Sequence, residues 1–98
     1  RGVIGLSDYK ISPAYPNPFN PTTTISYALP EISDVTLTIY DITGREVATI
    51  VHGQQPAGFH DVNWNGIDAT GNLVSTGVYF ARLHTGDYSQ TIKMVYLR

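Results

Sequence analysis

The sequence contains no cysteine, little charge and no long apolar run, and each of these absences excludes a class of structure or function. Without cysteine, neither a disulfide framework nor a thiolate metal site can form, so packing and hydrogen bonding must stabilise the fold. Charged residues make up 14% of the 98 residues and the formal net charge is -2, so no basic field favours nucleic acid as a partner. The absence of a run of about 18 apolar residues excludes a membrane-spanning helix, and no transmembrane segment is expected.

The first residues also lack the basic-then-apolar pattern of a secretory signal, and the chain begins with Arg1 rather than Met. We therefore expect a fragment of a longer protein, whose export signal, if it has one, lies elsewhere. A chain of this length buries roughly two thirds of the surface that it exposes when unfolded. One domain with one hydrophobic core is expected.

The stretch from Val35 to Val51 predicts a β-hairpin against which the rest of the chain packs. Up to Tyr40, apolar and polar side chains alternate with the period of two that is typical of a strand with one buried face. Asp41 to Gly44 interrupt this alternation, and Gly44 can adopt a positive φ without a steric penalty. We expect a tight reversal there and a second strand from Arg45 to Val51.

Similar alternation predicts further strands at 22–29, 59–65, 78–84 and 88–98. The last of these is apolar on both faces for several residues, which favours a strand paired inside a sheet. Residues 1–14 are either a linker or a short first strand, and residues 52–58 are expected to form an irregular crossover between sheets. Trp64, the only tryptophan, is expected to fill the middle of the core.

The segment Tyr15–Pro21, with the sequence YPNPFNP, cannot be a helix or a central strand. Its prolines fix φ, remove backbone donors and bias each preceding residue toward extended geometry. Because an aromatic residue stands near each end, we expect Tyr15 and Phe19 to be buried and the segment to lie as a rigid extended clamp across one end of the domain. The residues 15–98 are predicted to form the domain proper.

About seven strands are thus separated by turn signals at intervals near ten residues, with no sustained helical period. This spacing predicts an all-β fold, an immunoglobulin-like antiparallel β-sandwich without the cysteine pair of antibody domains. A short β-barrel is the alternative.

Candidate catalytic residues are few, and none has the spacing of a known site. The histidines stand in three separate segments, and aspartates beside glycine and asparagine are more typical of turns than of a glycosidase acid pair. No nucleophile-elbow signature is present. The residues considered were His52, His60, His84, Asp41, Asp61 and Asp68. We expect a module that is not an enzyme.

One oxygen-rich cluster could hold a calcium ion, because hard oxygen ligands lie close together in a loop. It lacks the Asp-x-Asp-x-Asp-Gly order and the bidentate Glu of the helix-loop-helix calcium site, so turn chemistry is the favoured interpretation. No other cofactor is expected. The calcium candidates are Asn65, Asp68, Thr70 and Asn72, with Asn63 beside them. Separately, Tyr40, Tyr79 or Tyr88 could stack on sugar rings, although strand aromatics more often pack in cross-strand pairs.

Taken in order, several segments closely resemble the type A C-terminal sorting domain of the type IX secretion system. The same body is similar to the immunoglobulin-like domain of the flagellar hook-capping protein. The segments are YPNPFNP (15–21), ISYALP (25–30), VTLTIYDITG (35–44), AGFHDVNWNGID (57–68), GVYFARL (77–83) and KMVYLR (93–98).

This resemblance implies a delivery label on a larger exported protein of the Bacteroidetes and related phyla. The N-terminal cargo would fold in the periplasm and cross the outer membrane when the translocon, with its shuttle and sortase proteins, reads the label; it would then be attached to the cell surface or released. The implied recognition residues are Pro16, Asn17, Pro18, Phe19, Gly77, Tyr79, Lys93, Met94, Val95 and Leu97.

The terminal strand is then the expected docking surface, which would offer free backbone groups by strand addition together with the charges of Lys93 and Arg98. The alternative function is a non-catalytic carbohydrate-binding or spacer module of a secreted enzyme.

Overall fold

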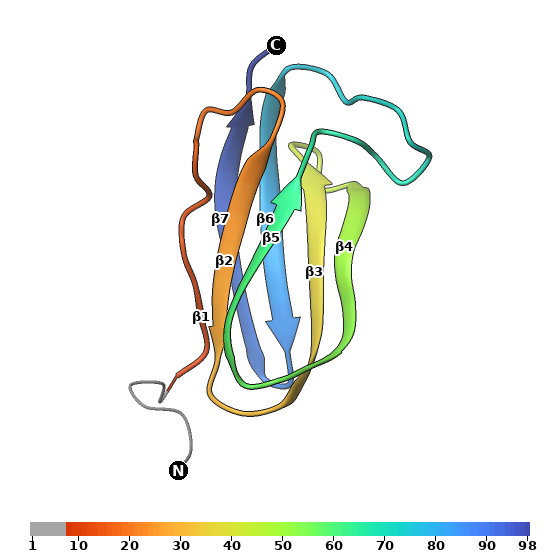
Figure 1. The fold of residues 1–98 in the computed structure, drawn as a ribbon. Coiled ribbons are helices and arrows are strands. Elements are labelled where there is room, and N and C mark those ends of the chain that lie inside the picture. Colours follow the sequence, from red (N-terminus) through yellow and green to blue (C-terminus); the bar gives the residue numbers. More distant parts are fainter. Residues whose placement is uncertain (1–7) are drawn as a thin grey trace.

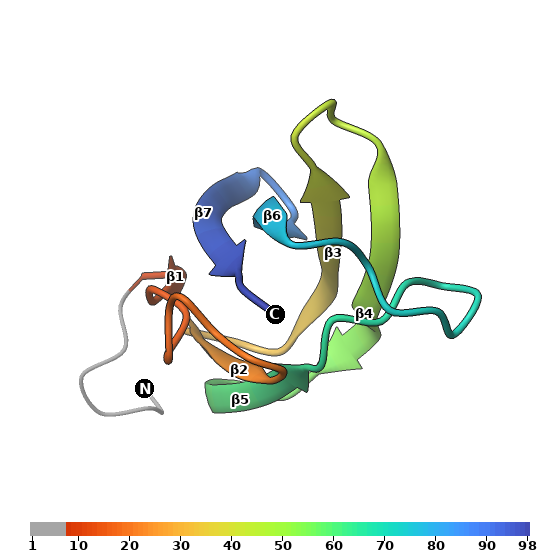
Figure 2. The same cartoon turned by 90° about the horizontal axis from the view of Figure 1, so that it is seen from above.

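Seven strands form two antiparallel sheets that pack face to face (Figure 1). A computed structural model describes residues 8–98. One sheet has the strand order β1-β2-β5 and the other the order β4-β3-β6-β7, and Figure 2 shows the two layers end on. The described residues contain no helix, and hence none able to cross a membrane. The strands are β1 (Lys10–Ile11), β2 (Thr23–Leu29), β3 (Ser33–Asp41), β4 (Glu46–Gln55), β5 (Gly58–Trp64), β6 (Gly77–Thr85) and β7 (Tyr88–Tyr96). The predicted all-β sandwich is confirmed, and the barrel alternative is wrong.

The core lies between the two sheets and is built from the inward half of each alternating strand. This agrees with the alternation from which β2 and β3 were predicted, and Trp64 is buried in the core as expected. Burying these side chains removes apolar surface from water, which is the main force that holds the two layers together. Fully buried members include Ile25, Leu29, Val35, Leu37, Ile39, Ala81, Leu83 and Met94.

The central hairpin is confirmed. β3 and β4 pair antiparallel, and the chain reverses through Gly44, whose φ is 86°. The backbone N–H of Gly44 donates to the carbonyl of Asp41 at 3.0 Å, and that of Asp41 donates to the carbonyl of Arg45 at 2.9 Å. A residue with a side chain would be strained at this positive φ, so Gly44 determines where the hairpin turns.

The chain crosses between the two sheets at 52–58 as expected, but the expected irregular conformation there is wrong. β4 continues to Gln55, which pairs with Ser33, and only Pro56 and Ala57 separate β4 from β5. The reason is that β4 is at the border of its sheet, where two register shifts also occur and much of the strand faces solvent. A border strand of this kind needs few apolar residues, so its low apolar content resembles that of a loop.

The terminal strand is also at a border rather than inside a sheet, contrary to expectation, because β7 pairs only with β6. The apolar residues on its second face, Val95 and Leu97, lie where the segment Asn17–Phe19 runs alongside the strand. That segment replaces the neighbouring strand that the two-sided apolar pattern predicted.

The described part of residues 1–14 includes a short strand, β1, which pairs with β2; residues 1–7 lie outside the described part. Ile11 and Ala14 are buried in the core, so this segment packs into the sandwich. The expected burial of Tyr15 is wrong, since its side chain is 81% exposed. Tyr15 pairs through its backbone with Thr24, whose hydroxyl lies on the outer face of β2, and opposed residues of an antiparallel pair point to the same face.

Candidate functional site

The segment Pro16–Phe19, called the strap below, is hydrogen bonded along the outer edge of β7. The side chain of Asn17 donates from Nδ2 to the carbonyl of Lys93 at 3.0 Å and accepts at Oδ1 from the backbone N–H of Val95 at 2.9 Å. Phe19 donates its N–H to the carbonyl of Val95 at 2.9 Å and accepts from the N–H of Leu97 at 3.1 Å. The strap therefore acts as a short parallel strand that covers the upper part of this edge.

An aromatic cluster under the strap ties it to three strands. The ring of Phe19 lies 5.1 Å from that of Tyr96 and 5.6 Å from that of Trp64, and Trp64 lies 5.4 Å from Tyr79. The buried polar groups of Trp64 and Tyr79 are hydrogen bonded. The indole N–H of Trp64 and the phenol O–H of Tyr79 donate to backbone carbonyls of the loop between β5 and β6, at 3.0 and 2.6 Å. The cluster thus fixes the strap, β5, β6, β7 and this loop in one arrangement.

The structure separates the ten predicted recognition residues by burial. Phe19, Tyr79 and Met94 are buried and pack in the core, although Tyr79 also borders a hollow of about 560 Å³ near the β3–β4 turn. Gly77, opposite Tyr96 in the β6–β7 register, is half-buried, as is Val95. Those that remain exposed are Pro16, Asn17, Pro18, Lys93 and Leu97.

The free backbone edge that was expected between Lys93 and Leu97 is not free. Four of its outward groups, the carbonyls of Lys93 and Val95 and the N–H groups of Val95 and Leu97, are bonded to the strap. Within residues 8–98, the part of β7 without hydrogen bonds to a second strand or to the strap is the lower part around Ser89 to Thr91, where Tyr9, just before β1, stacks on Tyr88. Strand addition at the terminal residues would require the strap to leave first.

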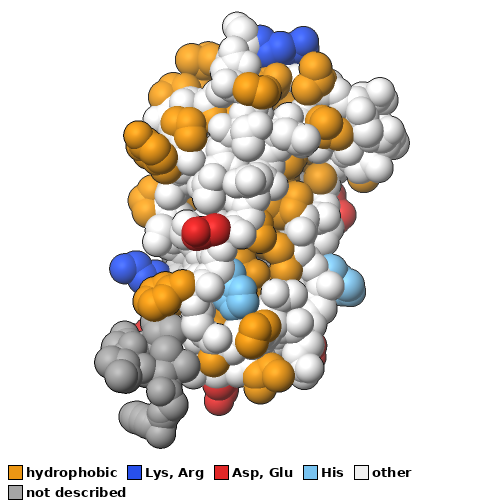
Figure 3. Space-filling model, viewed as in Figure 1, with side chains coloured by type: hydrophobic (Ala, Val, Ile, Leu, Met, Phe, Trp, Pro, Cys, Tyr) orange, Lys and Arg blue, Asp and Glu red, His pale blue; other side chains and the backbone are white. Residues whose placement is uncertain are grey.

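What the exposed residues do form is a surface at the end of the sandwich that carries the C-terminus, called the C-terminal surface below and defined by Asn17, Pro18, Lys93 and Leu97. Leu97 is 48% exposed and its neighbour Arg98 is anchored by its N–H to the Thr76 hydroxyl at 3.1 Å. Figure 3 shows hydrophobic side chains and basic atoms near this end. Exposed apolar groups beside cations can bind a protein surface, but they offer no nucleophile and no acid–base pair.

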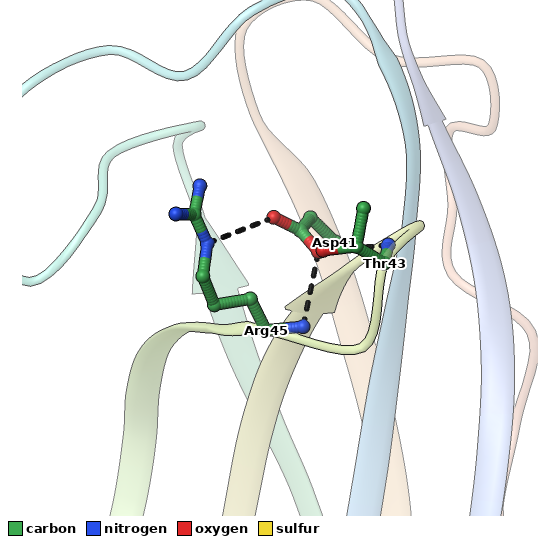
Figure 4. Close-up of polar contacts among 3 residues, drawn as sticks. All are labelled: Asp41, Thr43 and Arg45. Atoms are coloured by element: carbon green, nitrogen blue, oxygen red, sulfur yellow. Dashed lines mark hydrogen bonds and ion pairs between the residues drawn. The ribbon is translucent and has the colours of Figure 1, made fainter.

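Two turns with the same pattern, Asp-x-Thr-Gly, flank the hollow of about 560 Å³. In the turn of Figure 4, Oδ1 of Asp41 accepts hydrogen bonds from the N–H and hydroxyl of Thr43 at 2.9 and 2.6 Å and from the N–H of Arg45 at 3.0 Å. Oδ1 of Asp68 accepts the equivalent bonds from Thr70 and Asn72 at 2.9, 2.7 and 3.0 Å. This repetition was not predicted, although DITG (41–44) and DATG (68–71) are visible in the sequence.

The calcium candidates Asp68, Thr70 and Asn72 are brought together by this second turn, but Oδ1 of Asp68 and the hydroxyl of Thr70 are used within it. Oδ1 of Asp68 accepts three hydrogen bonds, and the hydroxyl of Thr70 also accepts from Nδ2 of Asn72 at 3.0 Å. Asn65 does not join this hydrogen-bond network. Over residues 8–98, no three side chains of His, Cys, Asp or Glu are grouped to hold a metal ion.

The two aspartates are ionised at neutral pH. The Thr43 hydroxyl and the Arg45 N–H lower the pKa of Asp41 below its ordinary 3.8, and the Thr70 hydroxyl and Asn72 N–H do the same to the pKa of Asp68. A general acid needs a raised pKa, so neither carboxyl group is suited to protonate a leaving group.

These lowered pKa values predict a pH-dependent stability. A carboxylate whose folded pKa is depressed stabilises the fold above its unfolded pKa, and this contribution is lost as the pH falls through the folded value. Asp68→Asn should therefore lower the urea unfolding midpoint at pH 7, and the gap to the wild type should close as the pH falls from about 4 to about 2. Asp34→Asn, on an exposed strand position, is the control; an equal gap at both pH extremes for Asp68→Asn would contradict this account.

The histidines and tyrosines do not converge. His52, His60 and His84 lie on β4, β5 and β6, and the ring of His60 stacks at 5.0 Å on Tyr27. Of the tyrosines considered for sugar stacking, Tyr79 is buried and Tyr88 stacks on Tyr9 at 5.5 Å, which is the cross-strand packing alternative.

Solved structures of two other proteins resemble this architecture. FlgD from P. aeruginosa is 33% identical with a TM-score of 0.60, and the match covers 76% of this chain and 57% of that one. Dimeric latent PorU from Porphyromonas gingivalis is 20% identical with a TM-score of 0.72, covering 99% of this chain and 10% of PorU; at that identity the likeness shows the fold alone. No curated protein matches the sequence.

The immunoglobulin-like character predicted from the strand spacing is thereby confirmed. The family model described as the FlgD Ig-like domain matches residues 17–94, which run from the strap into β7. The chain belongs to the family of FlgD Ig-like domains.

Proposed function

We propose that this domain is the C-terminal sorting domain of a larger exported protein, read by the type IX secretion translocon. The observation that carries the proposal is the union of the strap with β7, in which Asn17 bonds to Lys93, 76 residues further along the chain. The motifs YPNPFNP (15–21) and KMVYLR (93–98), on which the resemblance partly rests, thus contribute to one exposed surface. A passive label needs a stable fold and such a surface, and no reacting groups.

The geometry suits a label on a long protein. β1 lies away from the C-terminal surface, at the opposite end of the sandwich from the C-terminus (Figure 1). A cargo attached on the N-terminal side would therefore leave the C-terminal surface uncovered. The fold is shared with a part of PorU that makes up a tenth of that chain, which supports its use as one module of a longer protein.

In this proposal the translocon, with its shuttle and sortase proteins, contacts the C-terminal surface and not the backbone edge. The cargo passes through the periplasm and reaches the cell surface or the medium of a Bacteroidetes cell. Leu97 supplies apolar contact area and Lys93 a neighbouring charge, while the buried motif residues keep the strap in place.

A secretion assay tests the proposal. A reporter with an N-terminal export signal and this chain at its C-terminus should reach the surface or medium in a strain with a type IX system, and remain in the periplasm when the translocon is deleted. The double variant Lys93→Glu, Leu97→Asp should reduce secretion about tenfold or more, which corresponds to about 1.4 kcal/mol of recognition free energy. Both side chains are exposed, so stability should change little.

The matched control is Lys10→Glu, Ile32→Asp, which changes one exposed cation and one exposed apolar residue outside the C-terminal surface. Secretion without the translocon, or equal loss in both double variants, would refute the proposal. The alternative, a carbohydrate-binding module, predicts retardation by soluble neutral glycans in affinity electrophoresis, whereas a sorting domain should migrate unchanged.

A further inference from the structure

The outer face of the four-stranded sheet carries an open groove of about 200 Å³ that the proposed function does not use. Its walls are the outward side chains of two neighbouring strands, because Thr36 is opposite His84 and Thr38 opposite Arg82 in the β3–β6 register. The inward residues between them are core. The groove is lined by Thr36, Thr38, Tyr40, Arg82 and His84.

Arg82 is a positioned cation without a counterion. Its Nε donates to the hydroxyl of Ser89 on β7 at 2.9 Å, which orients the guanidinium group and leaves its terminal nitrogens available. In the part of the chain that the structure describes, the only ion pair joins Arg45 to Asp41, on a different turn. A guanidinium group held at Nε presents the planar pair of donors that matches two oxygens of an oxyanion.

The rest of the groove supplies further donors and little negative charge. Thr36 and Tyr40 contribute hydroxyl groups, and an imidazole nitrogen of His84 can donate as well. The hydroxyl of Thr38, a buried residue, also borders the groove and lies 3.4 Å from the Thr49 hydroxyl. Lys93 adds a second positive charge on the same outward side, two positions along β7 from Thr91, the register partner of Arg82. A carboxylate also lies beside the groove, since Glu46 is the register partner of Tyr40 and accepts a hydrogen bond from the Thr49 hydroxyl at 3.1 Å.

We propose that this groove binds a tetrahedral oxyanion, the phosphate or sulfate group of a small molecule, between Arg82 and the threonine hydroxyls. Arg82 makes the two-point contact, Thr36 and Thr38 donate to the remaining oxygens, and Tyr40 borders the group that carries the anion. The volume lies below the roughly 300 Å³ from which drug-sized ligand sites begin, so it suits one such group and a small attached portion.

Nuclear magnetic resonance titration of the 98-residue chain tests this site at constant ionic strength. Inorganic phosphate, inorganic sulfate and glucose 6-phosphate are the probes, and glucose is the uncharged comparison. The expected result is saturable amide shifts confined to the groove residues for the three anions and none for glucose. Tighter binding of glucose 6-phosphate than of free phosphate would identify the attached sugar as part of the ligand, and equal binding would identify the anion alone.

Two variants distinguish binding at the groove from a general electrostatic attraction of anions to the protein. Arg82→Gln should raise the dissociation constant for phosphate at least about tenfold, since the loss of charge-assisted contacts has effects of this order. Lys10→Gln removes one positive charge from the other sheet and should leave the constant within about twofold. Shifts that are scattered or do not saturate, or equal weakening in both variants, would overturn the proposal. None of these readouts depends on secretion.

Discussion

Phe19→Ala should lower the free energy of unfolding by about 3–5 kcal/mol, the range measured when a buried aromatic side chain is truncated. Phe19 is 2% exposed, and its ring fills the space between Tyr96 and Trp64. The strap has few other core contacts, so the cavity would also loosen the backbone bonds to Val95 and Leu97. Because a domain of this size is stable by only about 5–15 kcal/mol, a large part of its stability would be lost.

Urea denaturation followed by tryptophan fluorescence measures this effect, since Trp64 lies against the altered ring. Tyr15→Ala is the control within the same stretch of chain. Its side chain is 81% exposed, so the change should remain within about 0.5 kcal/mol. Similar losses for the two variants would show that the aromatic cluster does not hold the strap.

The strands and the hairpin could be predicted from the sequence because they depend on local patterns. Alternation along β2 and β3 indicates one buried face, and Gly44 indicates a reversal of the chain. No local sequence pattern predicts that the strap pairs with β7. This pairing depends on the amide of Asn17 and on backbone groups of distant residues, and backbone pairing partners of an irregular segment leave no periodic trace.

The two errors about sheet borders have one physical cause. An alternating pattern reports which faces of a strand are covered, but not what covers its edges. β7 is apolar on both faces although the strap, and not another strand, lies at its edge. The end of β4 from His52 to Gln55 is poor in apolar residues although it is part of a strand. The Arg82 groove was missed for a related reason, because it exists only through the register of β3 against β6.

The candidate recognition residues were identified by resemblance to a family. The structure divides them by side-chain burial, which such a resemblance does not indicate. The side chains of Phe19 and Met94 are buried, whereas that of Leu97 is half exposed. A motif can thus combine residues needed for folding with residues available to a partner. Experiments on the motif have to separate these two roles.

Removal of residues 93–98 should abolish the cooperative unfolding transition. The deletion takes away Met94 and Tyr96, which are 0% and 1% exposed, and with them every strap bond to β7. Losing one large buried side chain costs about 2–5 kcal/mol, so losing two, with part of a strand, exceeds the stability expected of such a domain. Circular dichroism and urea denaturation of the chain ending at Ile92 measure the outcome.

A chain that ends at Tyr96 provides the contrast, because it loses only Leu97 and Arg98. One strap bond, from the N–H of Leu97 to the carbonyl of Phe19, disappears, and the cost should be about 1 kcal/mol. If recognition occurs at the C-terminal surface, the shorter deletion should impair secretion of a reporter while the domain stays folded. The longer deletion would impair secretion through unfolding. A chain ending at Ile92 with the unfolding midpoint of the wild type would show that β7 and the strap do not complete the sandwich.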